Sequence, residues 1–109
     1  MVTLVELDLV VAQVTAELQE RGRDLRDDEI ELDERYHAGT YGIPDEATLD
    51  AMRLAARTEG MITDPVYEGK SMAALIDLVG RQEIPKDSTV LYAHLGGQPA
   101  LNGYSALFS

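Results

Sequence analysis

The stretch Met61-Ile62-Thr63-Asp64-Pro65-Val66-Tyr67-Glu68-Gly69-Lys70-Ser71 and the residues after it, to Gly80, contain the unit from which the fold can be predicted. The apolar run 61–63 predicts a short buried strand, and Asp64-Pro65 predicts a turn after it. A helix that ends at Gly80 is predicted by apolar residues at helical spacing, namely Met72, Leu75, Ile76 and Val79. A strand, a turn and a helix in this order are typical of an α/β fold.

Two helices and one strand are predicted on the amino-terminal side of this unit. Ile30 and Leu32 alternate with acidic residues, which predicts a short strand with one buried face. Pro44 and Asp45 open a helix that Gly60 ends. The inner face of that helix is marked by an apolar stripe of Leu49, Met52 and Ala56. A first helix nearer the amino terminus is predicted by another stripe: Leu4, Leu7, Val11, Val14 and Leu18.

On the carboxyl-terminal side, residues 89–93 give the strongest strand pattern in the chain, Gly96-Gly97 ends it, and Pro99 can begin a fourth helix. The order of elements is therefore helix, strand, helix, strand, helix, strand, helix. This alternation predicts an α/β fold, a partial three-layer parallel sheet with helices on both faces. Because three short strands leave the sheet edges open, residues 1–109 are expected to form a single partial domain.

The composition limits the classes of partner. The 109 residues contain 9 Lys and Arg against 20 Asp and Glu, a formal net charge of −11. Such a surface repels phosphate backbones and anionic lipids, so neither nucleic acid nor a membrane is an expected partner. The apolar stretch from Leu4 to Val11 is too short to cross a membrane and lacks the flanks of a signal peptide. A cytoplasmic protein is therefore expected.

No metal site is predicted. The chain has no cysteine, which excludes disulfides, thiolate catalysis and cysteine-based zinc or iron–sulfur sites. The acidic run from Asp24 to Glu34 lacks the glycine and the distal glutamate of a calcium loop. This run is expected to be a solvated surface stretch.

Two loops between predicted strands and helices, 63–71 and 94–99, are the places where an α/β fold gathers its functional residues. Tyr67 and Glu68 beside Lys70 have the groups needed for acid–base chemistry, or they are a half-buried tyrosine and a capping glutamate at a helix entry. Gly96-Gly97 either seats an anion or forms a tight turn, and the turn is the favoured interpretation. His94 is expected to be a packed, hydrogen-bonded side chain, and no role is assigned to His37.

Four blocks of sequence, in order, resemble one known family. They are Tyr41-Gly42-Ile43-Pro44, Ala56-Arg57-Thr58-Glu59-Gly60, residues 63–72, and the segment Ala93-His94-Leu95-Gly96-Gly97-Gln98-Pro99-Ala100-Leu101-Asn102-Gly103-Tyr104. Together they resemble the C-terminal third of the 1-aminocyclopropane-1-carboxylate deaminase and D-cysteine desulfhydrase family. These pyridoxal phosphate enzymes have the tryptophan synthase β-like fold, called fold type II. The resemblance therefore implies the C-terminal part of a fold type II domain, with pyridoxal 5'-phosphate as cofactor.

The resemblance implies roles for four residues. Tyr41 and Tyr67 match the two active-site tyrosines, and Tyr67 is the proposed nucleophile or proton carrier in ring opening. Glu68 matches the carboxylate that faces the pyridine nitrogen of the cofactor, where an anion keeps the nitrogen protonated and the ring a better electron sink. Leu95 matches a position that lines the pocket beside the cofactor ring.

Glu68 and Leu95 also match the deaminase branch, because desulfhydrases tend to carry a small hydroxyl residue and Thr at these positions. The implied reaction converts 1-aminocyclopropane-1-carboxylate, a small amino-acid substrate, to 2-oxobutanoate and ammonia. The alternatives are a D-cysteine desulfhydrase, which gives pyruvate, sulfide and ammonia, and a degenerate module without catalysis. Relatives form homo-oligomers, so the same is expected in the full-length family.

The parts of the family site that precede the matched region are the Schiff-base lysine, a catalytic serine, an asparagine and a glycine-rich phosphate loop. Among the amines of this chain, Lys70 matches a conventional lysine at a helix start and not the cofactor anchor, and Lys86 follows a surface turn. The isolated 109-residue chain is therefore expected to be inactive.

Overall fold

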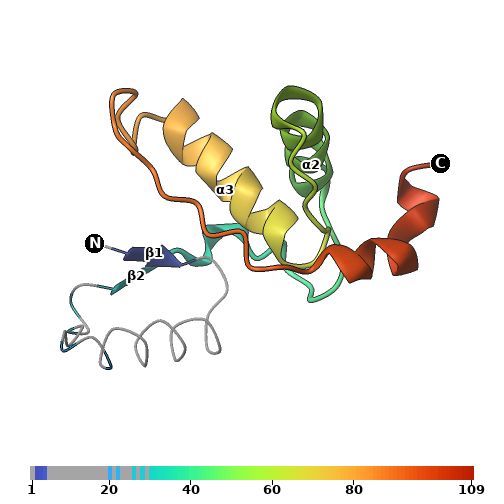
Figure 1. The fold of residues 1–109 in the computed structure, drawn as a ribbon, viewed down its shortest axis with the longest axis horizontal. Helices are drawn as coiled ribbons and strands as arrows, with labels where there is room; N and C mark the ends of the chain where they lie inside the picture. Colours follow the sequence, from blue (N-terminus) through green and yellow to red (C-terminus); the bar gives the residue numbers. More distant parts are fainter. Residues whose placement is uncertain (1, 5–19, 21, 23–25, 27, 29) are drawn as a thin grey trace. The chain divides into compact units, whose positions relative to one another are not determined.

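The computed structural model describes residues 2–4, 20, 22, 26, 28 and 30–109. The chain divides into two compact units, residues 1–35 and residues 36–109. The predicted first helix falls on residues 5–19, outside the described residues, except that Leu4 belongs to a strand. The elements described are β1 (Val2–Leu4), β2 (Ile30–Leu32), the 3₁₀ turn η2 (Glu34–Tyr36), α2 (Glu46–Glu59), α3 (Glu68–Gly80) and the 3₁₀ segment η3 (Gln98–Leu107) (Figure 1).

The first unit contains a parallel pair of short strands. β1 pairs with β2 in a register that sets Val2 opposite Ile30 and Leu4 opposite Leu32. The strand predicted at Ile30 and Leu32 is therefore confirmed, and its parallel pairing agrees with an α/β fold. Directly after β2, Asp33 is buried and forms an ion pair with Arg35, with Arg35 Nη2 2.6 Å from Asp33 Oδ2. This residue departs from the solvated surface predicted for the acidic run.

The helix predicted between Pro44 and Gly60 is confirmed as α2. Asp45 caps its first turn, because Asp45 Oδ1 accepts hydrogen bonds from the Thr48 amide at 2.9 Å and the Thr48 hydroxyl at 2.6 Å. The hydroxyl bond is the main reason that the pKa of the Asp45 carboxyl is lowered. At the other end Gly60 adopts φ 65°, and its N–H donates to the Ala55 and Ala56 carbonyl oxygens.

The third predicted helix, α3, also ends at Gly80 as expected, and it packs beside α2 (Figure 1). Its buried face differs in part from the predicted stripe: Met72 is buried, but Ala74 and Leu78 are buried in place of Ile76, which is exposed. The core joins Ala51 and Ala55 of α2 to Met72 of α3, with further apolar groups against them: Met61, Ala73, Leu75 and Tyr92. Small residues on both helices let their backbones approach closely.

The prediction of a parallel sheet in this second unit is not confirmed. Residues 61–63 and 89–93, predicted as strands, form no strand and have no paired neighbour among the described residues. A strand is stabilised by the hydrogen-bond ladder to its neighbours, and an apolar alternating pattern cannot supply that neighbour. The observed sheet is therefore only the two-stranded pair of the first unit.

The fourth helix begins near Pro99 as predicted, but it is a 3₁₀ segment with an irregular residue at Tyr104 (φ −117°, ψ 15°). Gly103 precedes that irregularity, and glycine weakens helix interiors, which accounts for the broken form. In the described part of the chain, no helix has the length and apolar character that a membrane crossing requires.

Candidate active site

Tyr41 and Tyr67, both predicted as catalytic, lie in hydrogen-bond contact. Their hydroxyl oxygens are 2.7 Å apart, and their rings meet edge to face with centroids 6.4 Å apart. The two residues are 26 positions apart in the sequence, so the fold and not the local chain brings them together. Both are exposed, Tyr41 by 72% and Tyr67 by 46%, so the pair faces the outside of this unit.

The segment before α2 holds Tyr41 in place. Gly42 adopts φ +75°, a conformation that side chains with a Cβ rarely adopt, and the Ile43 amide closes the turn on the Thr40 carbonyl. The Tyr104 hydroxyl of η3 then donates to the Gly42 carbonyl oxygen at 2.5 Å. The loop that carries Tyr41 is thus fastened by a residue 62 positions away.

Asp64 builds the turn that presents Tyr67 and Glu68. Its carboxylate is fully buried, with Oδ2 accepting from the Val66 and Tyr67 amides and Oδ1 accepting from the Glu68 amide, each at 2.9 Å. These are the free N–H groups at the start of α3, where a negative charge is also favoured by the helix dipole. Asp64 therefore acts as the cap of α3, and the Glu68 side chain is left free for other partners.

Glu68 is buried and reaches across to the segment that contains Leu95. Oε1 accepts a hydrogen bond from the Leu95 amide at 2.8 Å, and Oε2 lies 3.0 Å from the Tyr92 hydroxyl. The alternative of a capping glutamate is therefore wrong, because the carboxylate bonds to residues 24 and 27 positions later and not to its own helix. The four predicted site residues thus form two hydrogen-bonded pairs, Tyr41 with Tyr67 and Glu68 with Leu95, and Tyr67 and Glu68 are consecutive.

Tyr92 lies at the centre of a small hydrogen-bond network. Its hydroxyl is 2.8 Å from Ser71 Oγ and 2.9 Å from the Glu68 carbonyl oxygen, in addition to Glu68 Oε2. Burial is the main cause that raises the pKa of Tyr92 far above its ordinary value, and the Glu68 charge adds to it. The phenol therefore keeps its proton and can act as a hydrogen-bond donor at any physiological pH.

Gly96 and Gly97 lie in an irregular segment directly before η3, and the structure assigns no turn to them, so the tight turn predicted from the sequence is not confirmed. Both have positive φ angles, 124° and 88°. A Cβ on Gly97 would collide with Asp64 Oδ1 and would lie 2.7 Å from Asp64 Cγ. Because the Asp64 carboxylate lies against Gly97, a second anion there would be repelled, and the anion-seat interpretation is disfavoured.

Gly69 has a similar packing role within α3. A Cβ there would lie 2.6 Å from the Asp64 carbonyl oxygen and 2.9 Å from both Met52 Cγ and Thr48 Cγ2. Only glycine allows the first turn of α3 to pass this close to α2. Gly69, Gly97 and the buried Asp64 carboxylate therefore set the position of Tyr67 and Glu68 at the start of α3.

Lys70 is fully buried, and its Nζ donates to the His37 carbonyl oxygen at 3.1 Å. This contact joins the start of α3 to the segment before α2, and the interpretation of Lys70 as a conventional lysine and not the cofactor anchor stays a prediction. Lys86, the other lysine of the chain, is exposed after the turn that follows α3.

His94 is hydrogen-bonded as expected, but it is exposed, so the prediction of a packed side chain is wrong. Its Nε2 lies 2.8 Å from the Ile62 carbonyl oxygen, and because a carbonyl only accepts, Nε2 carries the proton. The other ring nitrogen lies 4.0 Å from Glu68 Oε2. His37, to which no role was assigned, accepts from the Gly39 amide through Nδ1.

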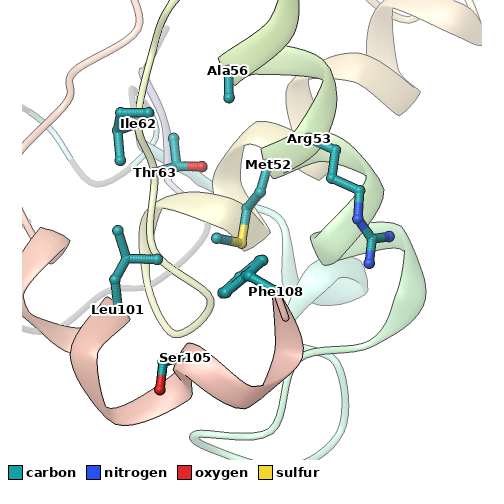
Figure 2. A pocket seen from close by; sticks show the side chains of 8 residues that line it. All are labelled: Met52, Arg53, Ala56, Ile62, Thr63, Leu101, Ser105 and Phe108. Carbon is teal, nitrogen blue, oxygen red and sulfur yellow. The ribbon is translucent and has the colours of Figure 1, made fainter.

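A pocket of about 420 Å³ lies on another part of this unit, between α2 and η3 (Figure 2). Its lining is mostly apolar and includes none of the four predicted site residues. Thr63 is one of the lining residues, and its buried hydroxyl has no hydrogen-bond partner among the residues that the structure describes. The complete lining is Met52, Arg53, Ala56, Ile62, Thr63, Leu101, Ser105 and Phe108.

Two residues important to the site were not identified from the sequence. Asp64 was interpreted only as part of a turn, although an aspartate just before a helix is a recognised capping signal. Tyr92 stands in the predicted strand 89–93, where an aromatic side chain is ordinary, and no local pattern indicates that its hydroxyl reaches Glu68.

Comparison with known proteins gives the family. Residues 7–96 match the profile described as pyridoxal-phosphate dependent enzyme. The chain is 60% identical over 100 residues to 1-aminocyclopropane-1-carboxylate deaminase of Ralstonia nicotianae, with 92% of this chain and 30% of the relative covered. It is 58% identical over 99 residues to the Burkholderia multivorans protein of the same name, with 91% and 29% covered.

A fungal relative is similar to the same extent. The probable 1-aminocyclopropane-1-carboxylate deaminase of Cryptococcus neoformans is 55% identical over 100 residues, with 92% of this chain and 29% of the relative covered. The chain thus spans about 30% of the length of the curated relatives that it matches. The chain belongs to the family of pyridoxal-phosphate dependent enzymes.

Proposed function

We propose that this chain supplies the cofactor-facing part of a 1-aminocyclopropane-1-carboxylate deaminase, with Tyr41 and Tyr67 as catalytic residues and Glu68 and Leu95 at the cofactor ring. The observation that carries the proposal is the pair of contacts that joins these residues: 2.7 Å between the two tyrosine hydroxyls and 2.8 Å between Glu68 and the Leu95 amide. The names of the relatives favour the deaminase over the desulfhydrase.

The donor and acceptor set at Glu68 fits pyridoxal phosphate. Each carboxylate oxygen can accept two hydrogen bonds, and the contacts to Leu95 and Tyr92 use one on each oxygen. Capacity therefore remains for one N–H of a protonated ring nitrogen. When bound, the cofactor supplies an electron sink, and a carboxylate at the ring nitrogen keeps that ring protonated. In the proposal, the Glu68 carboxylate accepts the hydrogen bond from that ring N–H, and the proton stays on the ring nitrogen.

The pair Tyr41 and Tyr67 can hold or move a proton at the hydroxyl oxygen of Tyr67. In a contact of 2.7 Å between two phenols, one hydroxyl donates and the other accepts. If Tyr41 donates, its proton stabilises negative charge on the Tyr67 oxygen, which is the form needed for a nucleophile or a proton acceptor. The proposal therefore assigns the reacting atom to Tyr67 and the supporting hydrogen bond to Tyr41.

Leu95 contributes through its side chain and its amide separately. The amide fixes Glu68, while the side chain is 63% exposed and available to line a ring or a substrate. The substrate proposed is 1-aminocyclopropane-1-carboxylate, which takes up one water to give 2-oxobutanoate and ammonia. The amine that anchors the cofactor comes, in this proposal, from outside residues 1–109.

The same proposal covers the remaining expectations. In a complete enzyme, residues 61–63 and 89–93 become strands of a parallel fold type II sheet once neighbouring strands pair with them. Residues 1–109 are then one part of a single domain, in a cytoplasmic homo-oligomer. What supports the sheet and the single domain is the family match over residues 7–96 and the strand-like pattern of the two segments.

The experiment is a chimera in which this chain replaces the matching 100 residues of the Ralstonia nicotianae deaminase. With 1-aminocyclopropane-1-carboxylate as substrate, we expect 2-oxobutanoate; with D-cysteine, we expect little sulfide. Because general acid–base catalysis contributes on the order of 10²–10⁴ in rate, Tyr67→Phe is expected to lower kcat by at least about a hundredfold.

The matched control is Tyr36→Phe. This substitution also removes a hydroxyl that bonds to a carboxylate of α3, that of Asp77 at 2.7 Å, and Asp77 is not one of the four site residues. It is expected to retain full kcat. If Tyr67→Phe were as active as Tyr36→Phe, or if the chimera preferred D-cysteine, the proposed function would be wrong.

A second test uses the 109-residue chain alone. Mixed with pyridoxal phosphate and borohydride, it is expected to give no adduct at a unique lysine, since Lys70 is buried and bonded. A stoichiometric adduct at Lys70 would contradict the assignment of the anchoring amine to another part of the enzyme.

A further inference from the structure

We propose that Tyr92 is a positioning residue that, together with the Leu95 amide, holds the Glu68 carboxylate in the orientation in which it meets the cofactor ring nitrogen. This inference rests on the function proposed above for Glu68. It goes beyond that function because it assigns a role to a residue that neither touches the substrate nor carries the reaction.

The geometry of the carboxylate is the first argument. One donor bonds to each oxygen: the Leu95 N–H to Oε1 at 2.8 Å and the Tyr92 hydroxyl to Oε2 at 3.0 Å. A carboxylate held at one oxygen can rotate about its last bond, whereas donors at both oxygens fix the carboxylate plane. The remaining lone pairs then point in one direction, as a directed hydrogen bond to a ring N–H requires.

The hydroxyl of Tyr92 is itself fixed. The phenol ring packs against the core formed by Ala51, Ala55 and Met72, and Ser71 Oγ lies 2.8 Å from its hydroxyl oxygen. The Glu68 carbonyl oxygen, 2.9 Å from the Tyr92 hydroxyl, competes for the Tyr92 proton, but it also accepts from Ser71 Oγ at 3.0 Å. With Ser71 as the donor to that carbonyl, the single Tyr92 proton is available to Glu68 Oε2. The core, through Tyr92, thereby determines where the carboxylate stands.

Proton counting shows why a phenol suits this position. Glu68 as an anion can only accept, so Tyr92 must donate, and the raised pKa of Tyr92 keeps that proton in place. His94 is the other group near Oε2, with Nδ1 4.0 Å away, which is too long for a hydrogen bond. Among the described side chains, the Tyr92 hydroxyl is therefore the one that bonds to Oε2.

The test is Tyr92→Phe in the holoenzyme form of the chimera, measured against Glu68→Gln and Tyr36→Phe. Tyr36→Phe is matched because it also removes one phenol-to-carboxylate hydrogen bond on α3, to Asp77. Two quantities are measured: the split between kcat and KM, and the ¹⁵N chemical shift of the ring nitrogen in ¹⁵N-labelled pyridoxal phosphate, which reports protonation of that nitrogen.

For Tyr92→Phe we expect kcat to fall about tenfold, the factor that one hydrogen bond to a charged group represents, with KM unchanged. The ring-nitrogen signal should move toward that of the unprotonated ring, in the same direction as in Glu68→Gln. Tyr36→Phe should change neither quantity. A residue with only a packing role would leave the nitrogen signal of the bound cofactor unchanged, since phenylalanine preserves the ring.

The outcomes separate the inference from the function on which it rests. If Glu68→Gln changes the nitrogen signal and kcat but Tyr92→Phe changes neither, the inference is overturned and the proposed function stands. If Glu68→Gln changes neither quantity, the proposed role of Glu68 fails, and the positioning role fails with it. If Tyr92→Phe yields too little folded holoenzyme, Ser71→Ala takes its place. For Ser71→Ala we expect a smaller shift of the ring-nitrogen signal in the same direction, and an unchanged signal would count against the inference.

Discussion

Asp64→Asn tests the account of how the site is built, because the substitution changes charge and hydrogen bonding with almost no change in shape. Oδ2 of Asp64 accepts two backbone amides and Oδ1 accepts a third. An asparagine has one acceptor oxygen, so its NH₂ group must face at least one of these N–H groups. Asp64 is 0% exposed, so no water can take over the lost bond.

The expected loss follows from these bonds. Removal of one buried hydrogen bond to a charged acceptor costs about 1.5–3 kcal/mol, and the remaining bonds lose their charge assistance. We therefore expect Asp64→Asn to lower the free energy of unfolding by about 3 kcal/mol. The measurement is urea unfolding of the 109-residue chain followed by far-ultraviolet circular dichroism.

The matched control is Asp45→Asn at the cap of α2. There a single oxygen, Oδ1, accepts both bonds from Thr48, and an asparagine carbonyl can keep both. Asparagine and aspartate are nearly equivalent as helix caps, so the expected loss at neutral pH is below about 0.5 kcal/mol. If the two variants lost the same stability within that margin, the account of Asp64 as a cap that needs both oxygens would be refuted.

Three further outcomes are expected. Gly97→Ala combines a positive φ with a collision against Asp64, whereas Gly60→Ala has a positive φ but open space around the new Cβ. In the same assay, Gly97→Ala should therefore lower the free energy of unfolding by at least about 1–2 kcal/mol more than Gly60→Ala. The pKa of Asp45 in the folded protein lies below its ordinary value of 3.8, so its contribution to the free energy of unfolding is complete above pH 3.8 and is lost as the pH falls through the folded pKa. Acid unfolding of Asp45→Asn should lack this loss of stability. Tyr36→Phe, which removes the hydrogen bond to Asp77, should lower the unfolding free energy by about 1 kcal/mol, and a loss near zero would show that this bond adds nothing.

The local elements could be predicted where the sequence carries its own signals. α2 has a capping aspartate and a terminal glycine, and both ends were placed correctly. α3 ends at Gly80 as predicted, but its buried face was misjudged because Ala74 and Leu78 pack inward while Ile76 does not. Hydrophobic size alone does not decide which face of a helix meets a close neighbour.

The strands show the opposite case. Residues 61–63 and 89–93 have apolar patterns suited to a sheet, yet they lack paired neighbours among the described residues. Strand formation depends on a partner that the segment itself does not contain. Tyr41 and Tyr67 are 26 positions apart, so their contact could not be predicted from periodicity. The family resemblance placed both residues in one active site but did not predict that contact.

The close packing of Gly97 on the Asp64 carboxylate makes these two positions dependent on one another. Any side chain at position 97 needs the space that the carboxylate fills, and any shortening at position 64 leaves a cavity beside Gly97. Substitutions at the two positions should therefore be non-additive in a double-mutant cycle. Anyone who exchanges sequence between members of this family would have to transfer both segments as one block.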